Sequence, residues 1–99
     1  MATLSSGEID QRLADLPGWR REQDEIGEQD EIVYEGKLAD FAAAISLVER
    51  VAELAEAANH HPDILVHGYN GVRLTLSTHS EGGLTEADFK LAAQIERLT

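Results

Sequence analysis

Two adjacent histidines stand directly before a proline in the stretch ANHHPD, which spans residues 58–63. Histidine is the side chain that most readily gains and loses a proton near neutral pH. Adjacent histidines on a solvated surface would mean little, whereas histidines aimed into a pocket by a helix end could act as general acid and base. The stretch therefore predicts proton-transfer chemistry, provided that the chain places His60 and His61 at such a helix end.

Pro62 decides how the two imidazoles are presented. A residue that precedes proline is pushed out of the helical conformation, so the helix should stop near His60 and leave His61 extended. The two rings then point in different directions. Because Glu56 lies four residues before His60, we expect a carboxylate–imidazole contact between them across the last helical turn.

A predicted hairpin further along the chain brings in a third histidine. Asn70-Gly71 is the strongest short signal for a two-residue type I′ turn. With these two residues at the centre of the turn, paired positions sum to 141, and His79 lies opposite Pro62.

The predicted cluster gathers three imidazoles at one end of the sheet with a carboxylate nearby: His60, His61, His79 and Glu56. Three hydroxyl side chains should surround it: Ser77, Thr78 and Ser80. His67 lies further along the hairpin and should stand apart from this cluster.

Other interpretations of these residues exist. Each histidine could be an ordinary surface or hydrogen-bonded group. Three imidazoles also suit zinc, but adjacent residues rarely chelate one ion together, so we expect no metal. Trp19, the only tryptophan, fits either a core position or a wall on which a planar ligand stacks. Asp88 is expected to be a helix cap rather than a catalyst.

Capping residues and apolar periodicity predict three helices to position these groups. The first and last should each begin with a capping box, formed by Ser5 with Glu8 and by Thr85 with Asp88. The longest covers residues 41–59. Two adjoining apolar stripes give it a wide apolar face, with Phe41, Ile45, Val48, Ala52 and Ala55 in one and Leu47, Val51, Leu54 and Ala58 in the other.

Two hairpins separate the helices. Residues 19–35 contain an alternating patch at 32–34 and a possible turn at 24–27, and the second hairpin surrounds Asn70-Gly71. Asp40 is expected to be the N-cap of the long helix. The order is α-β-β-α-β-β-α, which predicts a single α+β domain over residues 1–99, with a four-stranded antiparallel sheet and helices packed on one face.

Composition excludes several kinds of function. The 19 acidic and 8 basic residues give a formal charge of −11, so nucleic acid would be repelled. The absence of cysteine rules out disulfides and thiol chemistry. The longest apolar run, residues 41–45, is far shorter than the roughly 20 residues of a membrane span, and no secretory signal is recognised. We expect a soluble, cytoplasmic protein that does not bind membranes.

Three stretches of the chain resemble the pterin-4a-carbinolamine dehydratase family: EAANHHPD, then YNGVRLTLSTH, then GGLTEADFKLAAQIE. The similarity extends from Leu16 through the last helix. The combination of Glu-x-x-x-His-His-Pro with a later Ser-Thr-His is specific to this family, although neither half alone would be. The resemblance implies a four-stranded antiparallel sheet with helices on one side, and dimers that pair into homotetramers.

The resemblance also implies an activity. Members of the family dehydrate 4a-hydroxytetrahydropterin, the carbinolamine left by aromatic amino acid hydroxylases, to quinonoid dihydropterin and water. This step recycles tetrahydrobiopterin and needs no metal or organic cofactor. The substrate implied for this chain is therefore a small pterin, and functional coupling to an aromatic amino acid hydroxylase is expected.

The residue roles implied by the resemblance follow the same motifs. His60, His61 and His79 would surround the pterin, and Glu56 would orient or charge His60. His61 and His79 would flank the reacting edge, one as acid and the other as base, in an order that the sequence leaves open. The implied substrate contacts are Asn59, Ser77, Thr78 and Ser80.

The chain departs from the family pattern at three positions. Asn59 stands where aspartate is common, Ser80 where an acidic residue is common, and Ile64 where an aromatic residue is frequent. The alternative to the enzyme is a non-catalytic interaction or assembly-factor protein on the same scaffold. A dehydratase that acts on a different pterin, such as one of molybdenum-cofactor metabolism, is a third possibility.

Overall fold

The computed structural model describes residues 3–24, 26–27 and 29–99. Its elements are α1 (Ser6–Leu13), β1 (Trp19–Gln23), β2 (Asp30–Lys37), α2 (Phe41–Ala58), β3 (Asp63–His67), β4 (Gly71–Leu76), the short 3-10 helix η1 (His79–Glu81) and α3 (Glu86–Glu96). Apart from η1, this is the predicted order, and the predicted α+β class is confirmed. Of the predicted turn at 24–27, residue 25 lies outside the described residues.

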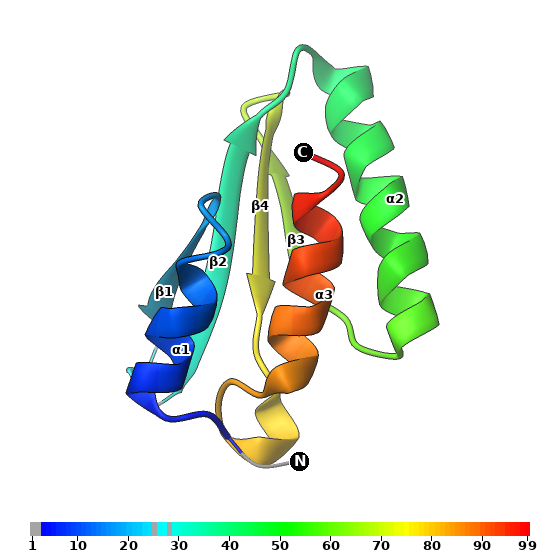
Figure 1. Cartoon of the computed structure of the whole chain (residues 1–99). Coiled ribbons are helices and arrows are strands. Elements are labelled where there is room, and N and C mark those ends of the chain that lie inside the picture. The colour runs from blue at the N-terminus through cyan, green and yellow to red at the C-terminus, as the bar shows by residue number, and fades with distance from the viewer. Residues whose placement is uncertain (1–2, 25, 28) are drawn as a thin grey trace.

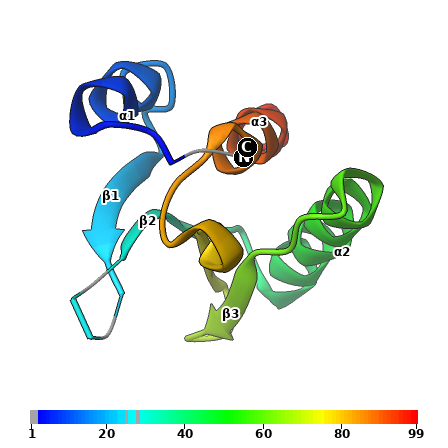
Figure 2. The same ribbon diagram turned by 90° about the horizontal axis from the view of Figure 1, so that it is seen from below.

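The four strands form one antiparallel sheet in the order β1-β2-β4-β3. The two hairpins therefore join through β2 and β4, which leaves β1 and β3 at the edges. Figures 1 and 2 show α1, α3 and α2 side by side across one face of the sheet, with α3 in the middle. The helices begin where predicted, because local capping residues hold their first turns: Ser5 with Glu8, Asp40, and Thr85 with Asp88.

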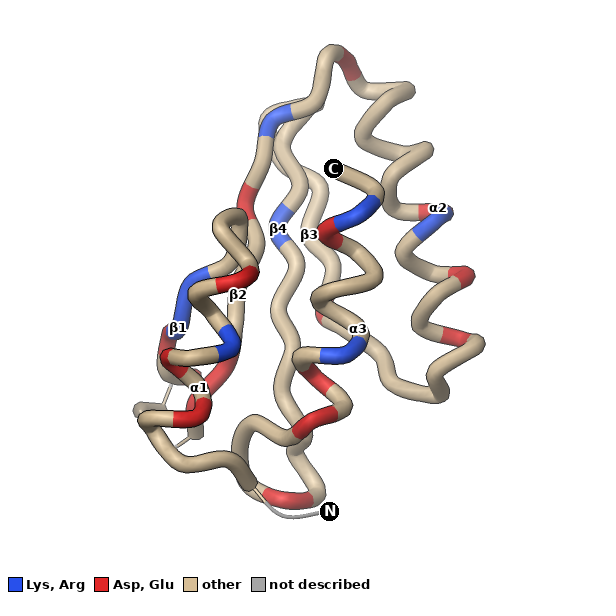
Figure 3. The backbone as a smooth tube through the Cα atoms, viewed as in Figure 1, with Lys and Arg blue, Asp and Glu red and all other residues tan. Residues whose placement is uncertain are grey.

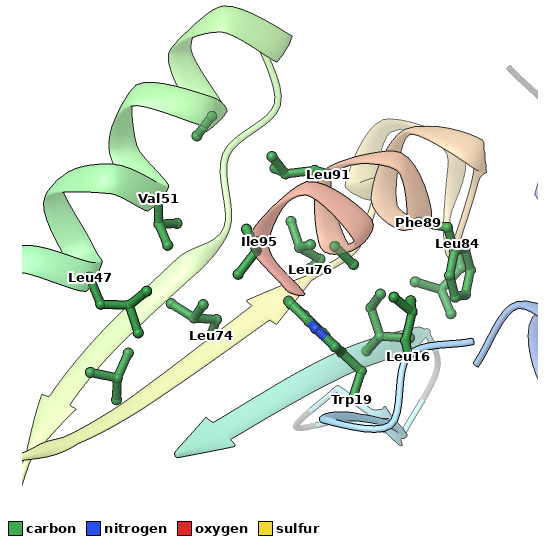
Figure 4. Close-up of a cluster of buried hydrophobic side chains, with 14 of the residues drawn as sticks. Leu16, Trp19, Leu47, Val51, Leu74, Leu76, Leu84, Phe89, Leu91 and Ile95 are labelled. Atoms are coloured by element: carbon green, nitrogen blue, oxygen red, sulfur yellow. The ribbon is translucent and has the colours of Figure 1, made fainter. Parts of the chain in front are cut away.

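The core lies between the sheet and the helices (Figure 4). Leu74 and Leu76 of β4 are fully buried and pack with side chains of α2 and α3, among them Val51 and Ile95. Each such side chain contributes about 1.5–3 kcal/mol when it leaves water completely. On α2, Val51 and Leu47 are buried while Phe41 remains 55% exposed, so part of the predicted wide apolar face is uncovered.

The second hairpin does not have the predicted register. Asp63 pairs with Thr75 and His67 with Gly71, so paired positions sum to 138 instead of 141. The turn consists of residues 68–70, of which the first two have positive φ angles of 56° and 59°. The prediction that Asn70-Gly71 forms the centre of the turn is therefore wrong.

A contact with another part of the chain explains this register. The main-chain carbonyl of Asn70 accepts from the N–H of Leu38 at 2.8 Å, and its side-chain Nδ2 donates to the Leu38 carbonyl at 2.9 Å. Asn70 is thereby held beside the end of β2. Because β4 ends at Leu76, His79 does not lie opposite Pro62 as predicted but begins η1 beyond the strand.

Acidic residues outnumber basic ones along the whole described chain (Figure 3). The two adjacent cations on β1 are both paired: Arg20 with Glu22 at 2.6 Å and also with Glu35, and Arg21 with Asp30 at 2.8 Å. Among the described residues, none of the helices has the length and apolarity that crossing a membrane requires.

Candidate active site

The end of α2 separates the two adjacent histidines. Ala58 is the last helical residue, and Asn59 adopts the left-handed conformation with φ 49° and ψ 44°. The N–H of His60 donates back to the carbonyl of Ala55 at 3.1 Å, which closes the helix end. This confirms the predicted helix stop near His60, and it turns the following residues away from the axis of α2.

His60 is directed toward α3. Its Nε2 lies 2.6 Å from Oδ1 of Asp88, and the two side chains are 16% and 0% exposed. A carboxylate oxygen accepts, so Nε2 is the donor of this bond, and no hydrogen bond of Nδ1 is found among the described residues. The predicted contact between Glu56 and His60 is wrong, because the left-handed Asn59 breaks the i, i+4 geometry on which it depended.

Asp88 is both a helix cap and the partner of His60. Its Oδ2 accepts from the N–H of Thr85 at 2.9 Å, as the predicted capping box requires, and from Oγ1 of Thr78 at 2.8 Å. Buried polar groups need such partners, and this carboxylate has three: His60 at Oδ1, and Thr78 and Thr85 at Oδ2. Sequence reasoning found the cap but missed the histidine contact, for which the sequence carried no local signal.

His61 takes the carboxylate that was expected to serve His60. Its Nε2 lies 2.5 Å from Oε2 of Glu56, and the two side chains are 57% and 77% exposed. Nε2 is again the donor, and the part of the chain that the structure describes again offers no partner to Nδ1. Both histidines are therefore anchored through the same ring nitrogen, His60 in a buried pair and His61 in a solvated one.

His79 is the first residue of η1, on the second of the two predicted site segments. Its Nε2 lies 3.3 Å from Oγ of Ser77. The preceding residue, Thr78, forms a bridge with Gly83 in addition to its bond to Asp88. Ser80 and Asn59 are both exposed.

The structure thus joins the two predicted site segments, residues 59–61 and 77–80, through Asp88. Thr78 and His60 bond to opposite oxygens of this carboxylate, and His61 and His79 are their chain neighbours. Within the described part of the chain, no three histidine, aspartate or glutamate side chains are grouped closely enough to hold a metal ion. His67 lies on β3, outside these segments.

Trp19 belongs to the core and is 5% exposed (Figure 4). Of the two roles considered for it, the structure gives it the packing role, and its ring contacts Tyr34 with centroids 5.9 Å apart. An open groove of about 820 Å³ runs between α1, the end of α2 and α3, with His60 on its wall. Of the described site residues predicted above, only His60 lines this groove, so the groove borders the site without containing it.

Comparison with known proteins gives a consistent result. The sequence profile of the family described as "Pterin 4 alpha carbinolamine dehydratase" matches residues 2–98. Proteins from Chloroflexus aggregans and Acidobacterium capsulatum, each named "Putative pterin-4-alpha-carbinolamine dehydratase", are both 52% identical over 98 residues. The alignments cover 99% of this chain and 98% and 99% of those proteins. The chain belongs to the pterin 4 alpha carbinolamine dehydratase family.

Two solved structures share the fold. A protein from Brucella melitensis described as a "transcriptional coactivator/pterin dehydratase" superposes with a TM-score of 0.86 at 34% identity, covering 97% of each chain. A pterin dehydratase-like protein identified as a RuBisCO assembly factor in the alpha-carboxysome gives a TM-score of 0.66 at 24% identity, covering 82% of this chain and 88% of that one. The second likeness extends to the fold alone.

Proposed function

We propose that this protein is a hydro-lyase that converts 4a-hydroxytetrahydropterin to quinonoid dihydropterin and water. The observation that carries the proposal is the pairing of His60 with the buried carboxylate of Asp88, which fixes one imidazole of the HHP stretch, next in sequence to the exposed His61. Family membership and the curated relatives' names support the same reaction. The protein would then act in tetrahydropterin recycling, coupled to an aromatic amino acid hydroxylase in the cytoplasm.

The reaction needs one proton donor and one acceptor. Hydroxide leaves C4a as water once its oxygen is protonated, and a ring N–H loses its proton so that the electron pair forms the new C=N bond. No electrons enter or leave overall. Histidine can perform either transfer near neutral pH, and His61, anchored through Nε2, would use its Nδ1 for one of them. His79 would perform the other.

The remaining residues would bind and orient the pterin. Asn59 and Ser80 are exposed on the two segments that meet at Asp88 and could present polar atoms to the heterocycle. Thr78 has its hydroxyl proton committed to Asp88, so its part would be to hold the site together. Glu56 would orient His61 and not His60.

The proposal is tested by supplying the unstable substrate directly. An aromatic amino acid hydroxylase generates the carbinolamine in the cuvette, and the appearance of quinonoid dihydropterin is followed with and without this protein. We expect a rate well above the uncatalysed one and proportional to protein concentration. A rate unchanged by the protein would favour the alternative of a non-catalytic assembly or interaction protein, as one structural neighbour's description illustrates.

We further propose that the protein forms homodimers, which pair into homotetramers. β3 is an edge strand, and Leu65 at its centre is 53% exposed. An unpaired edge with an apolar side chain favours pairing with a second strand. Phe41 and Tyr69, 55% and 67% exposed, add apolar surface that a second copy would cover.

A further inference from the structure

A fully buried hydroxyl lies behind the candidate site and is connected to it by hydrogen bonds. Oγ1 of Thr85, the N-cap of α3, lies 2.9 Å from Oγ1 of Thr78, which in turn donates to Oδ2 of Asp88 at 2.8 Å. Asp88 accepts from His60 through its other oxygen. The contacts thus form one continuous chain from the start of α3 to an imidazole at the end of α2.

The direction of each bond in this chain is determined by counting protons. A hydroxyl has a single proton, and that of Thr78 goes to the carboxylate of Asp88. In the contact between the two hydroxyls, Thr85 must therefore be the donor and Thr78 the acceptor. Oγ1 of Thr85 also accepts from the N–H of Ala87 at 3.3 Å, so its donor and acceptor capacities are both in use.

We propose that Thr85 is a positioning residue for the dehydration, acting through Thr78 and Asp88 on His60; this inference rests on the function proposed above. By donating to Thr78, the Thr85 hydroxyl keeps the Thr78 proton on Asp88. The carboxylate is then held in one orientation, with Oδ1 directed at Nε2 of His60. Thr85 and Asp88 are both 0% exposed, so bulk water is not in place to supply a substitute donor.

The capping box of α1 shows that a helix in this protein can begin without the extra hydrogen bonds that the box of α3 makes. There, Ser5 and Glu8 exchange the same two bonds, at 3.3 Å and 3.0 Å, on an exposed surface. The box of α3 is buried, and its carboxylate bonds to the hydroxyl of Thr78 and to the imidazole of His60 as well. The two boxes therefore form a matched pair in one molecule, of which only one is connected to the site.

Among the described residues, the other charged groups near His60 take no part in the series of hydrogen bonds that runs from Thr85 to His60. Four of these groups share the groove wall with His60: Arg12, Asp15, Glu86 and Lys90. Two others, Glu56 and His61, lie close to His60 in the sequence and pair with each other. A substitution of Thr85 that removes only its hydroxyl leaves all of these charges in place. A change in the properties of His60 in such a variant would then result from the loss of the Thr85 hydrogen bond and not from a change in local charge.

The test compares Thr85→Val, which removes the hydroxyl at nearly constant volume, with Thr85→Ser, which retains it, and with Ser5→Ala in the other capping box. In substrate-free, nitrogen-15-labelled protein, the Nε2–H proton of His60 should give a downfield signal protected from exchange with water. We expect Thr85→Val to shift or abolish this signal, and Thr85→Ser to restore it. Ser5→Ala should leave it in place.

Turnover of the carbinolamine supplies the second measurement. We expect Thr85→Val to lower kcat roughly fivefold to tenfold with little change in KM, the size of effect that one ordinary hydrogen bond has. Thr85→Ser should recover most of this loss. An unchanged His60 signal and unchanged kcat in Thr85→Val would overturn the inference, as would an equal loss of kcat in Ser5→Ala. The histidine signal needs no substrate, so failure of the proposed activity would be recognised separately.

Discussion

Nε2 of His60, just beyond α2, donates to Oδ1 of Asp88 in the first turn of α3 over 2.6 Å. This bond joins two elements that are 28 residues apart in the chain and fixes the ring of the first histidine in HHP. Each of the two adjacent histidines thus has its own carboxylate partner, because Glu56 pairs with His61 and not with His60 as predicted. The site consequently has one largely buried imidazole–carboxylate pair and one solvated pair.

Replacing Asp88 with asparagine should lower kcat at least tenfold, about 1.4 kcal/mol of transition-state stabilisation. If the amide presents its N–H2 to His60, Nε2 can only accept and the ring is forced into the other tautomer. If it presents its oxygen to His60, its nitrogen faces Thr78 and Thr85, and the N–H of Thr85 loses its acceptor. Steady-state kinetics with the carbinolamine measure the effect. The matched control is Glu8→Gln, at the same position of the other capping box. Equal activities for the two variants would contradict a role for Asp88 in the site.

Glu56→Gln should have a smaller effect than Asp88→Asn, less than about fivefold on kcat. The pair of Glu56 with His61 is largely exposed, and solvent screens such pairs so that they contribute little. The measurement is kcat at low and at high salt, since an exposed ion pair weakens as ionic strength rises. A loss as large as that of Asp88→Asn would contradict the smaller role assigned to the exposed pair.

Glu31→Gln should raise the melting temperature at neutral pH. Burial raises the pKa of Glu31 above its ordinary value of 4.5, and the nearby carboxylates of Asp24 and Asp63 raise it further. The folded protein therefore binds this proton more tightly than the unfolded chain, and stability is lost as pH rises from about 4.5 through the raised pKa.

Glutamine removes that loss, so the gain in melting temperature should be present at pH 7 and vanish near pH 3, where the carboxyl is protonated in both states. Circular dichroism melts at the two pH values measure it, with the exposed Glu53→Gln on α2 as control. A gain of the same size at both pH values, or none at pH 7, would be inconsistent with the raised pKa.

Leu65→Lys should shift the protein toward smaller assemblies. A lysine at the centre of the edge strand β3 opposes strand pairing, and in a symmetric pair it would place like charges near one another. Light scattering coupled to gel filtration, at equal protein concentrations, gives the mass of each variant. Gln11→Lys, on the exposed surface of α1, is the control. If Leu65→Lys has the mass of the wild-type assembly, pairing through β3 is excluded.

The parts of this structure that the sequence predicted are those decided by neighbours in the chain. The capping boxes, the N-cap at Asp40 and the end of α2 before Pro62 all follow from side chains within a few residues of one another. The register of the second hairpin does not follow from chain neighbours. Asn70 bonds to Leu38, 32 residues earlier, and does not form the centre of a local turn.

The partners of the histidines were mispredicted for the same reason. An i, i+4 argument assigned Glu56 to His60, but that geometry exists only while the helix continues, and Asn59 ends it. The true partner, Asp88, was recognised as a cap, and its second oxygen could be assigned only once the packing of α3 against the end of α2 was known.

The central claim is that imidazoles of this site transfer the protons of the dehydration, and the histidines of the chain themselves provide the control. Carbinolamine turnover is compared among wild type, His61→Ala, His79→Ala and His67→Ala, the last on β3 outside the site segments. The account predicts that kcat/KM falls at least tenfold in the first two variants and stays within about twofold of wild type in the third. Three variants with the same rate as wild type would contradict it.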